Sequence, residues 1–157
     1  MPIVTQAAPR TFTGQKISVQ GIVSAENGAA NSCLFVVTYQ PKGYVGPHYH
    51  DEEQLLHCLE GEGLVYFENN PQPLEEGQVA VIPAGVRHAI FNTGQNQFRV
   101  AVFSPVAVPT THWLTNKKRG ALPMPFIHDV FEPPTDAAKN DNQIHPAVGG
   151  HSVAVKK

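Results

Sequence analysis

Three histidines and a glutamine in this chain are spaced like the ligands of a single metal ion. His48 and His50 are two residues apart, Gln54 follows them, and His88 comes from a later segment. Successive side chains of an extended strand alternate between its faces, so residues 48, 50 and 54 are expected to point the same way. On a helix the two histidines would point to different sides. Two imidazoles and a carboxamide on one face, joined by a third imidazole from a second strand, predict a mononuclear metal site within β structure.

The composition fits one domain and excludes several kinds of partner. The chain has 157 residues, of which 41% are hydrophobic and 15% are charged, and its formal net charge is −2. The sequence has no basic patch of the kind that would predict nucleic-acid binding. It also has no run of 18 apolar residues, which a membrane span would need. The N-terminus lacks the pattern of a signal peptide. Cys33 and Cys58 form no disulfide framework and are expected to be buried free thiols, so we expect a cytoplasmic protein.

Short apolar runs separated by turn residues predict an all-β fold. The runs are rich in Val, Ile, Phe and Tyr, and prolines and glycines separate them. Many short strands at regular spacing are typical of an antiparallel sandwich or barrel. A turn is also expected at Asn69-Asn70-Pro71. The predicted strands are Lys16–Ser24, Ser32–Gln40, Gln54–Leu59, Gly63–Glu68, Gln78–Ile82, His88–Asn92 and Gln97–Phe103.

The part of the chain after Pro105 has a different character. Prolines are frequent there and apolar residues do not alternate cleanly. Trp113 and several large apolar residues after it need burial, so Pro105–Thr135 is expected to be an ordered, extended arm. Asp136–Lys157 is polar and is expected to be mobile or to lie on a partner subunit.

The histidines lie in two short motifs, of which the second is the more specific. It begins at Gly77 and reads G-x5-P-x-G-x2-H-x3-N, with Pro83, Gly85, His88 and Asn92 at the fixed positions. Pro83 is expected to end one strand, and Gly85 to take the positive φ that reverses the chain. His88 then enters the next strand, which carries its imidazole back toward the first pair.

The first motif begins at Gly43 and includes His48, His50, Gln54 and Gly61. Together the two motifs resemble those of the cupin superfamily, although the first has four rather than five residues between Gly43 and His48. The resemblance covers about residues 32–105, and residues 62–76 resemble the short inter-motif loop of compact cupins. A lone histidine would more often be a buried, hydrogen-bonded wall residue, but three in register with a matching second motif favour metal binding.

This resemblance implies a jelly-roll β-barrel that holds one divalent metal ion (Zn, Fe, Ni or Mn) near one mouth, and it implies a homodimer. We expect N-terminal strands or an arm at 1–31, the barrel core at 32–105, an extended C-terminal arm at 106–135 and a mobile tail at 136–157.

The fourth ligand position holds Gln54 where the usual cupin has glutamate. Strand alternation favours Gln54 over the neighbouring Glu53, with a water molecule as the remaining alternative. A shell of three histidines and a glutamine is neutral, so a divalent cation keeps its full charge. Because glutamine takes no proton, it cannot act as a general base. Glutamine at this position resembles some cupins that do no redox chemistry, including polyketide cyclases.

Three further side chains are candidate catalytic residues. Tyr39 and Tyr44 flank the first motif, and either phenol can serve as an acid or oxyanion partner, although packing is the commoner role of such tyrosines. Arg99 lies within an apolar run, so it either pairs with a carboxylate or points into the barrel to bind an anionic substrate.

These features predict a metal-dependent enzyme that acts on a small, oxygen-rich carbonyl or enol substrate by Lewis-acid catalysis. The reaction would be a cyclisation, isomerisation, dehydration or lyase step. Two alternatives stay open, a cupin dioxygenase that uses O2 and a cupin that binds a small ligand without catalysis.

Overall fold

The computed structural model describes residues 3–68, 70–114 and 121–123, and the regular secondary structure of this part of the chain is almost entirely β. A short 3-10 turn, η1 (Ala25–Asn27), follows the second strand. The strands are β1 (Arg10–Phe12), β2 (Ile17–Val23), β3 (Cys33–Tyr39), β4 (Tyr44–His50), β5 (Gln54–Glu60), β6 (Glu62–Phe67), β7 (Asn70–Glu75), β8 (Val79–Ile82), β9 (His88–Phe91), β10 (Phe98–Ser104), β11 (Thr110–Trp113) and β12 (Ala121–Pro123).

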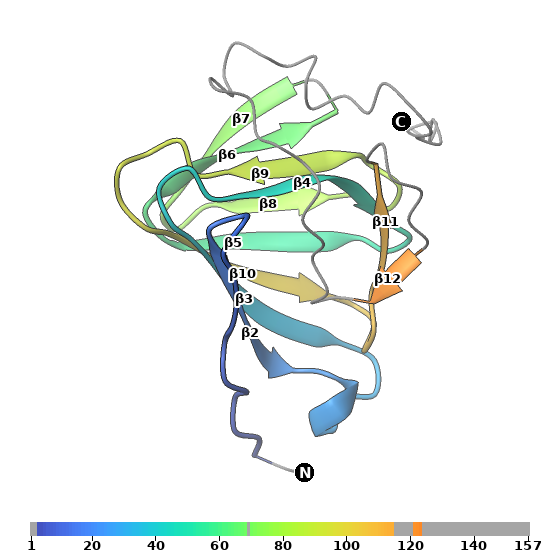
Figure 1. Ribbon diagram of the computed structural model, residues 1–157. Coiled ribbons are helices and arrows are strands. Elements are labelled where there is room, and N and C mark those ends of the chain that lie inside the picture. The colour runs from blue at the N-terminus through green and yellow to red at the C-terminus, as the bar shows by residue number, and fades with distance from the viewer. Residues whose placement is uncertain (1–2, 69, 115–120, 124–157) are drawn as a thin grey trace.

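The strands form two six-stranded antiparallel sheets that enclose one interior (Figure 1). The first sheet has the order β1-β2-β3-β10-β5-β8, and the second has the order β12-β11-β4-β9-β6-β7. Consecutive strands often lie in different sheets, so the chain passes repeatedly from one wall of the barrel to the other. The expected all-β jelly-roll barrel is thereby confirmed.

One apolar cluster drawn from both sheets fills the interior. Inward and outward side chains alternate along β3 and β10, so Phe35, Val37 and Val100 are buried while their neighbours are more exposed. Val65 and Ile90 enter the same cluster from the opposite sheet. Full burial of one such side chain contributes about 1.5–3 kcal/mol. Both cysteines are buried free thiols, as expected.

All seven predicted strands are present, and each of their ends agrees with the prediction to within one residue. The turn expected at Asn69-Asn70-Pro71 is wrong in its described part, because Asn70–Glu75 is strand β7. The expected loop at 62–76 is instead the hairpin of β6 and β7. Two prolines are tolerated in β7 because it lies at the edge of its sheet, where only one side needs hydrogen bonds.

Segments outside the expected core also belong to the sheets. Strand β2 pairs with β3, and β11 pairs with β4, the strand that carries two of the histidines. The start of the expected C-terminal arm is therefore part of the barrel wall. The rest of that arm, apart from residues 121–123, and the expected tail lie outside the described residues. No helix in the described part of the chain has the length and apolar character needed to cross a membrane.

Candidate metal centre

The three predicted histidine ligands meet inside the barrel. His48 and His50 come from β4, and His88 begins the adjacent strand β9, directly opposite His48. The ring centroids of His48 and His88 are 4.1 Å apart, and His50 lies 4.9 Å from His48 and 5.4 Å from His88. One ring nitrogen of each histidine lies within 4.8 Å of the other two, and all three residues are buried. The geometry that the sequence spacing predicts is therefore present.

Main-chain carbonyls fix the orientation of each imidazole. His48 Nδ1 lies 2.7 Å from Gly46 O, His50 Nδ1 lies 2.8 Å from Thr110 O, and His88 Nδ1 lies 2.9 Å from Val86 O. A carbonyl oxygen only accepts hydrogen bonds, so each Nδ1 must carry the proton and donate it. Each Nε2 of a neutral ring is then a free lone pair, which is the form in which histidine binds metals.

Burial keeps the three rings neutral. It lowers the pKa of His50 to about 4 and that of His88 to about 3, and it lowers the pKa of His48 well below 6.5. A positive charge on one ring would also repel a charge on its neighbours, which lowers the pKa of His48 and His88 further. The three imidazole rings are therefore uncharged near neutral pH, and their lone pairs are available to bind a metal ion.

Two of the buried nitrogens have no partner among the described residues. His50 Nε2 and His88 Nε2 make no hydrogen bond with any described residue. A buried polar atom without a partner is costly, and such atoms in native structures often mark an ion or ligand. Neutral imidazole nitrogens suit Zn, Fe, Ni and other transition metals. The residues present therefore fit the divalent cation that the sequence analysis predicts.

Gln54 joins this group from the opposite sheet. It begins β5, and its side chain is 2% exposed. Burial dominates the lowered pKa of His50, and the nearby Gln54 side chain opposes that lowering. Gln54 Nε2 has no partner among the described residues. Glu53, the alternative ligand, is exposed.

The reasoning that selected Gln54 needs a correction. It treated residues 48 to 54 as one strand, but the chain bends at Asp51 and Glu52 and passes from one sheet to the other. Gln54 points inward because it opens the alternation of β5, in which Leu56 and Cys58 are also buried and His57 is exposed. Gln54 therefore points inward as predicted, but it belongs to β5 and not to the strand that carries His48 and His50.

Strand β11 completes the surroundings of the site, and the sequence analysis did not find this contribution. Thr111 lies opposite His50 and Trp113 opposite His48. The Trp113 and His48 ring centroids are 5.0 Å apart. The Glu52 carboxylate accepts a hydrogen bond from Thr110 N at 3.4 Å. No spacing in the sequence signals that β11 pairs with β4 across sixty residues.

The three candidate catalytic side chains do not lie with the histidines. Tyr39 is buried inside the barrel, but its ring packs at a tilt against Phe98 near Asn92, at the opposite end of β9 from His88. Tyr44 packs with Phe91 in a second apolar cluster on the other face of its sheet.

A β-bulge between Val45 and His48 explains the position of Tyr44, because it breaks the alternation that would have put residues 44 and 48 on one face. Arg99 takes the first of its two expected roles. Its side chain is 40% exposed, and NH1 lies 3.4 Å from Glu60 Oε2 on the outside of the barrel.

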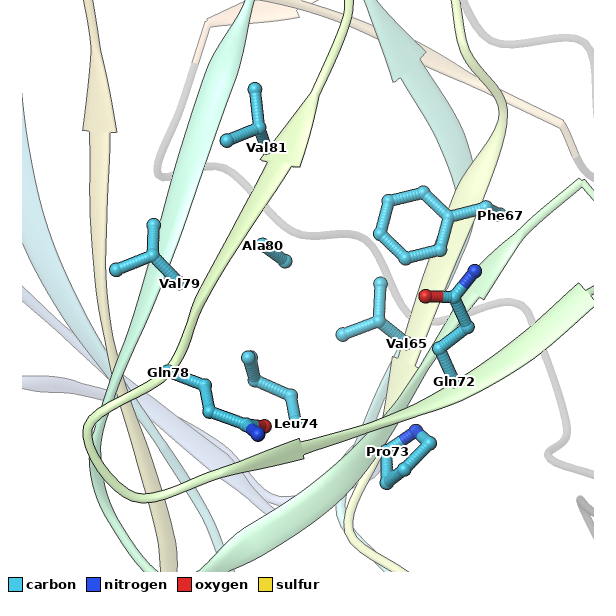
Figure 2. Close-up of a pocket in the computed structure, with 9 residues that line it drawn as sticks. All are labelled: Val65, Phe67, Gln72, Pro73, Leu74, Gln78, Val79, Ala80 and Val81. Atoms are coloured by element: carbon cyan, nitrogen blue, oxygen red, sulfur yellow. The ribbon is translucent and has the colours of Figure 1, made fainter.

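A groove of about 690 Å³ opens between β8 and the hairpin of β6 and β7. Figure 2 shows its wall, which includes Val65, Phe67 and Leu74 on the hairpin side and Val79, Ala80 and Val81 on β8. None of the predicted ligands lines the groove. Phe67 is, however, the cross-strand partner of His88, so the groove comes within one side chain of the metal centre.

Comparison with known proteins agrees with this geometry. The family model described as "Cupin domain" matches residues 35–104, which run from β3 to the end of β10 and include all four predicted ligands. These residues form a cupin domain. The resemblance carried by the two motifs is thus confirmed.

Two curated proteins are similar to parts of this cupin. A protein of Aquifex aeolicus (strain VF5), described only as uncharacterized, is 42% identical over 60 residues, which cover 38% of this chain and 50% of that protein. Protein SchB of Streptomyces halstedii is 32% identical over 74 residues, which cover 46% of this chain and 54% of SchB. The chain therefore spans about half the length of the curated relatives that it matches.

Solved structures share the cupin fold at lower identity. The polyketide cyclase RemF of Streptomyces resistomycificus superposes with a TM-score of 0.55 at 22% identity, over 58% of this chain and 66% of RemF. A recombinant oxalate oxidase superposes with a TM-score of 0.58 at 21% identity, over 64% of this chain and 56% of that one. Identities this low establish a common fold only.

Proposed function

We propose that this cupin is a mononuclear metal-dependent enzyme for a small, oxygen-rich carbonyl or enol substrate. The reaction would be a cyclisation, isomerisation, dehydration or lyase step without net redox change. The observation that carries the proposal is the convergence of three buried, neutral imidazoles whose Nδ1 atoms are all hydrogen-bonded to carbonyls. When bound there, a divalent cation supplies Lewis acidity, which polarises a carbonyl or stabilises an enolate.

The neutral ligand set favours this chemistry. No carboxylate from the described residues joins the three histidines, and Gln54 is the buried side chain beside His50. Gln54 cannot accept a proton, so it would orient its oxygen without acting as a base. The Nδ1 bonds hold the rings in place, so little reorganisation is needed when charge develops on a substrate oxygen.

The apolar interior would keep bulk water from the reacting oxygen. Val65 and Leu74 line the groove of Figure 2 and also belong to the core. Phe67 lines this groove and is the cross-strand partner of His88. We infer that a small substrate would approach along the groove, whose wall combines apolar side chains with those of Gln72 and Gln78.

Metal and oxygen measurements would test the proposal. Protein purified without added metal should contain about one divalent ion (Zn, Fe, Ni or Mn) per chain by elemental analysis. Turnover of a hydroxyketone or enol substrate should proceed equally well with and without air. Consumption of O2 would instead support the dioxygenase alternative. Saturable ligand binding without turnover would support a binding protein. We also propose that the protein is a homodimer that acts on a small molecule, and the same preparations can be used to test both points.

The variant Gln54→Glu tests the ligand role of Gln54. A carboxylate would add a negative charge to the shell, so we expect tighter Zn²⁺ binding and a changed preference among divalent metals. Competition with a chelator would measure both properties. The exposed substitution Glu53→Gln is the matched control and should leave them unchanged. An identical metal profile in Gln54→Glu and the parent protein would contradict the assignment.

A further inference from the structure

Trp113 carries a buried hydrogen-bond donor for which the described structure offers no acceptor. The residue is 6% exposed, and its indole Nε1 makes no hydrogen bond with any described residue. An indole N–H can only donate, and a buried one usually finds an acceptor. Leaving such a group unpaired destabilises the protein, so its retention needs an explanation.

The position of Trp113 relates this donor to the metal centre. Trp113 lies directly opposite His48 in the pairing of β11 with β4, so the two side chains project from the same face of the sheet. That face is the barrel interior, because Trp113 belongs to the core cluster that both sheets share. The Trp113 and His48 rings are 5.0 Å apart with an interplanar angle of 37°.

The described polar groups around His48 do not satisfy the indole. His48 Nδ1 donates to Gly46 O, and His50 Nδ1 donates to Thr110 O. The Nε2 atoms, which could accept a hydrogen bond, are the atoms that would bind the cation under the proposed function. The acceptor for Trp113 is therefore expected to arrive with a bound molecule.

We propose that the Trp113 indole N–H donates a hydrogen bond to an oxygen of the substrate held at the metal centre. This inference rests on the proposed function and narrows its substrate class. The substrate would carry an acceptor oxygen (carbonyl, enolate or carboxylate) beside the oxygen that faces the cation. Because the indole has no charge and accepts nothing, it would select against an amine or any other donor at that position.

The single tryptophan of the chain allows a direct test by NMR. Protein labelled with ¹⁵N gives one indole Nε1–H signal, and it can be loaded with Zn²⁺ and titrated with maltol, a hydroxyketone that chelates divalent cations through two oxygens. A new hydrogen bond should move the indole proton signal downfield at saturation. An unchanged indole signal in protein shown to bind both Zn²⁺ and maltol would overturn the inference.

The variant Trp113→Phe removes the donor and keeps a ring. We expect its Zn²⁺ affinity to stay within about twofold of the parent value and its maltol affinity to fall about tenfold, the size of one neutral hydrogen bond. Its affinity for imidazole, which binds the cation through nitrogen and offers no oxygen, should not change. Tyr49→Phe is the matched control, because this ring stacks on His112 outside the barrel.

The outcomes separate this inference from the function on which it rests. If the parent protein binds no Zn²⁺, both the proposed function and the inference are wrong. If Zn²⁺ and maltol bind but Trp113→Phe keeps full maltol affinity, only the inference is wrong. If Trp113→Phe does not fold, the NMR titration of the parent protein decides.

Discussion

At the scale of single residues, the metal centre depends on what lies behind each imidazole. The carbonyls of Gly46, Thr110 and Val86 each accept a hydrogen bond from one Nδ1. These bonds select the tautomer and the direction of the lone pair without adding a charge. The arrangement therefore presents three neutral nitrogens to one another in the buried interior of the barrel.

Removal of one histidine should abolish tight metal binding. We expect His88→Ala to lower Zn²⁺ affinity by more than about 100-fold, since even loss of an outer hydrogen-bond partner of a ligand typically costs 10–100-fold. Chelator competition would measure the affinity, and far-UV circular dichroism would check the fold. His57→Ala, at an exposed position of β5, is the control. Equal affinities in the two variants would contradict the proposed centre.

The metal-free protein should lose stability in mild acid. Burial lowers the pKa of His50 and His88 to about 4 and about 3, whereas unfolded histidine titrates near 6.5. Between these values the unfolded chain binds more protons than the folded one. The stabilisation is thus complete above about pH 6.5 and declines as the pH falls toward the folded pKa values, by up to about 1.4 kcal/mol per pH unit for each histidine.

Urea denaturation of chelator-treated protein at pH 7, 6 and 5 would measure this decline in the free energy of unfolding. The exposed variant His57→Gln should show nearly the same dependence as the parent protein. A midpoint that does not move between pH 7 and pH 5 would contradict the neutral, buried state of the rings.

The sequence predicted the histidines well and the residues around them poorly. Fixed spacing within two short motifs identified the four candidate ligands, because each motif is local. Tyr44 was predicted to lie near the metal, but a bulge in β4 reverses the alternation of side chains before His48. The residues near the bulge do not signal it. Trp113 was recognised only as a residue that needs burial, since its partner His48 lies far away in the chain.

At the scale of elements, turns and a bulge bring the ligand strands together. Gly85 adopts a φ of +77° in the turn before β9, and its N–H donates to His50 O at 2.8 Å. The turn that delivers His88 is thus tied to the strand that carries His50. The motif glycine serves the reversal that the sequence predicts for it.

Gly43, the glycine that begins the first motif, has no room for a side chain. A Cβ on Gly43 would lie 2.6 Å from Lys16 O and 2.8 Å from Gln40 O, and both atoms belong to the backbone. We expect Gly43→Ala to lower the free energy of unfolding by about 1–3 kcal/mol, measured by urea denaturation. Gly94→Ala is the control, since the nearest atom there is 3.4 Å away. Equal stability of the two variants would contradict this close packing.

Strands that alternate cleanly were predicted, and strands rich in proline or threonine were not. β3 and β10 are buried at every second residue, which is the pattern that identifies a half-buried strand. β7 contains Pro71 and Pro73, and β11 is a short strand whose sequence lacks apolar alternation. Pairing across the barrel, rather than local preference, makes these two segments extended.

At the scale of the whole molecule, the two sheets share one core. Residues of β2, β3 and β10 pack against residues of β4, β6 and β9, and Trp113 is part of the same cluster. Neither sheet can separate from the other without exposing this surface. The described part of the chain is therefore one folding unit, consistent with a single cupin domain.

Unfolding should accordingly be a single transition. Urea denaturation followed by Trp113 fluorescence and by far-UV circular dichroism should give coincident curves, because the fluorophore and most strands depend on the same core. A fluorescence change that precedes the loss of β structure would show that β11 detaches first, and it would contradict the single unit.

The bond between His50 Nδ1 and Thr110 O joins two positions that are sixty residues apart. The ribosome makes the histidines first and adds about 5–20 residues per second, so roughly 3–12 s separate the synthesis of these two positions. During that interval the His50 ring lacks the acceptor that sets its tautomer. A nascent or truncated polypeptide should therefore hold cellular zinc or iron weakly, and ion capture should come near the end of translation.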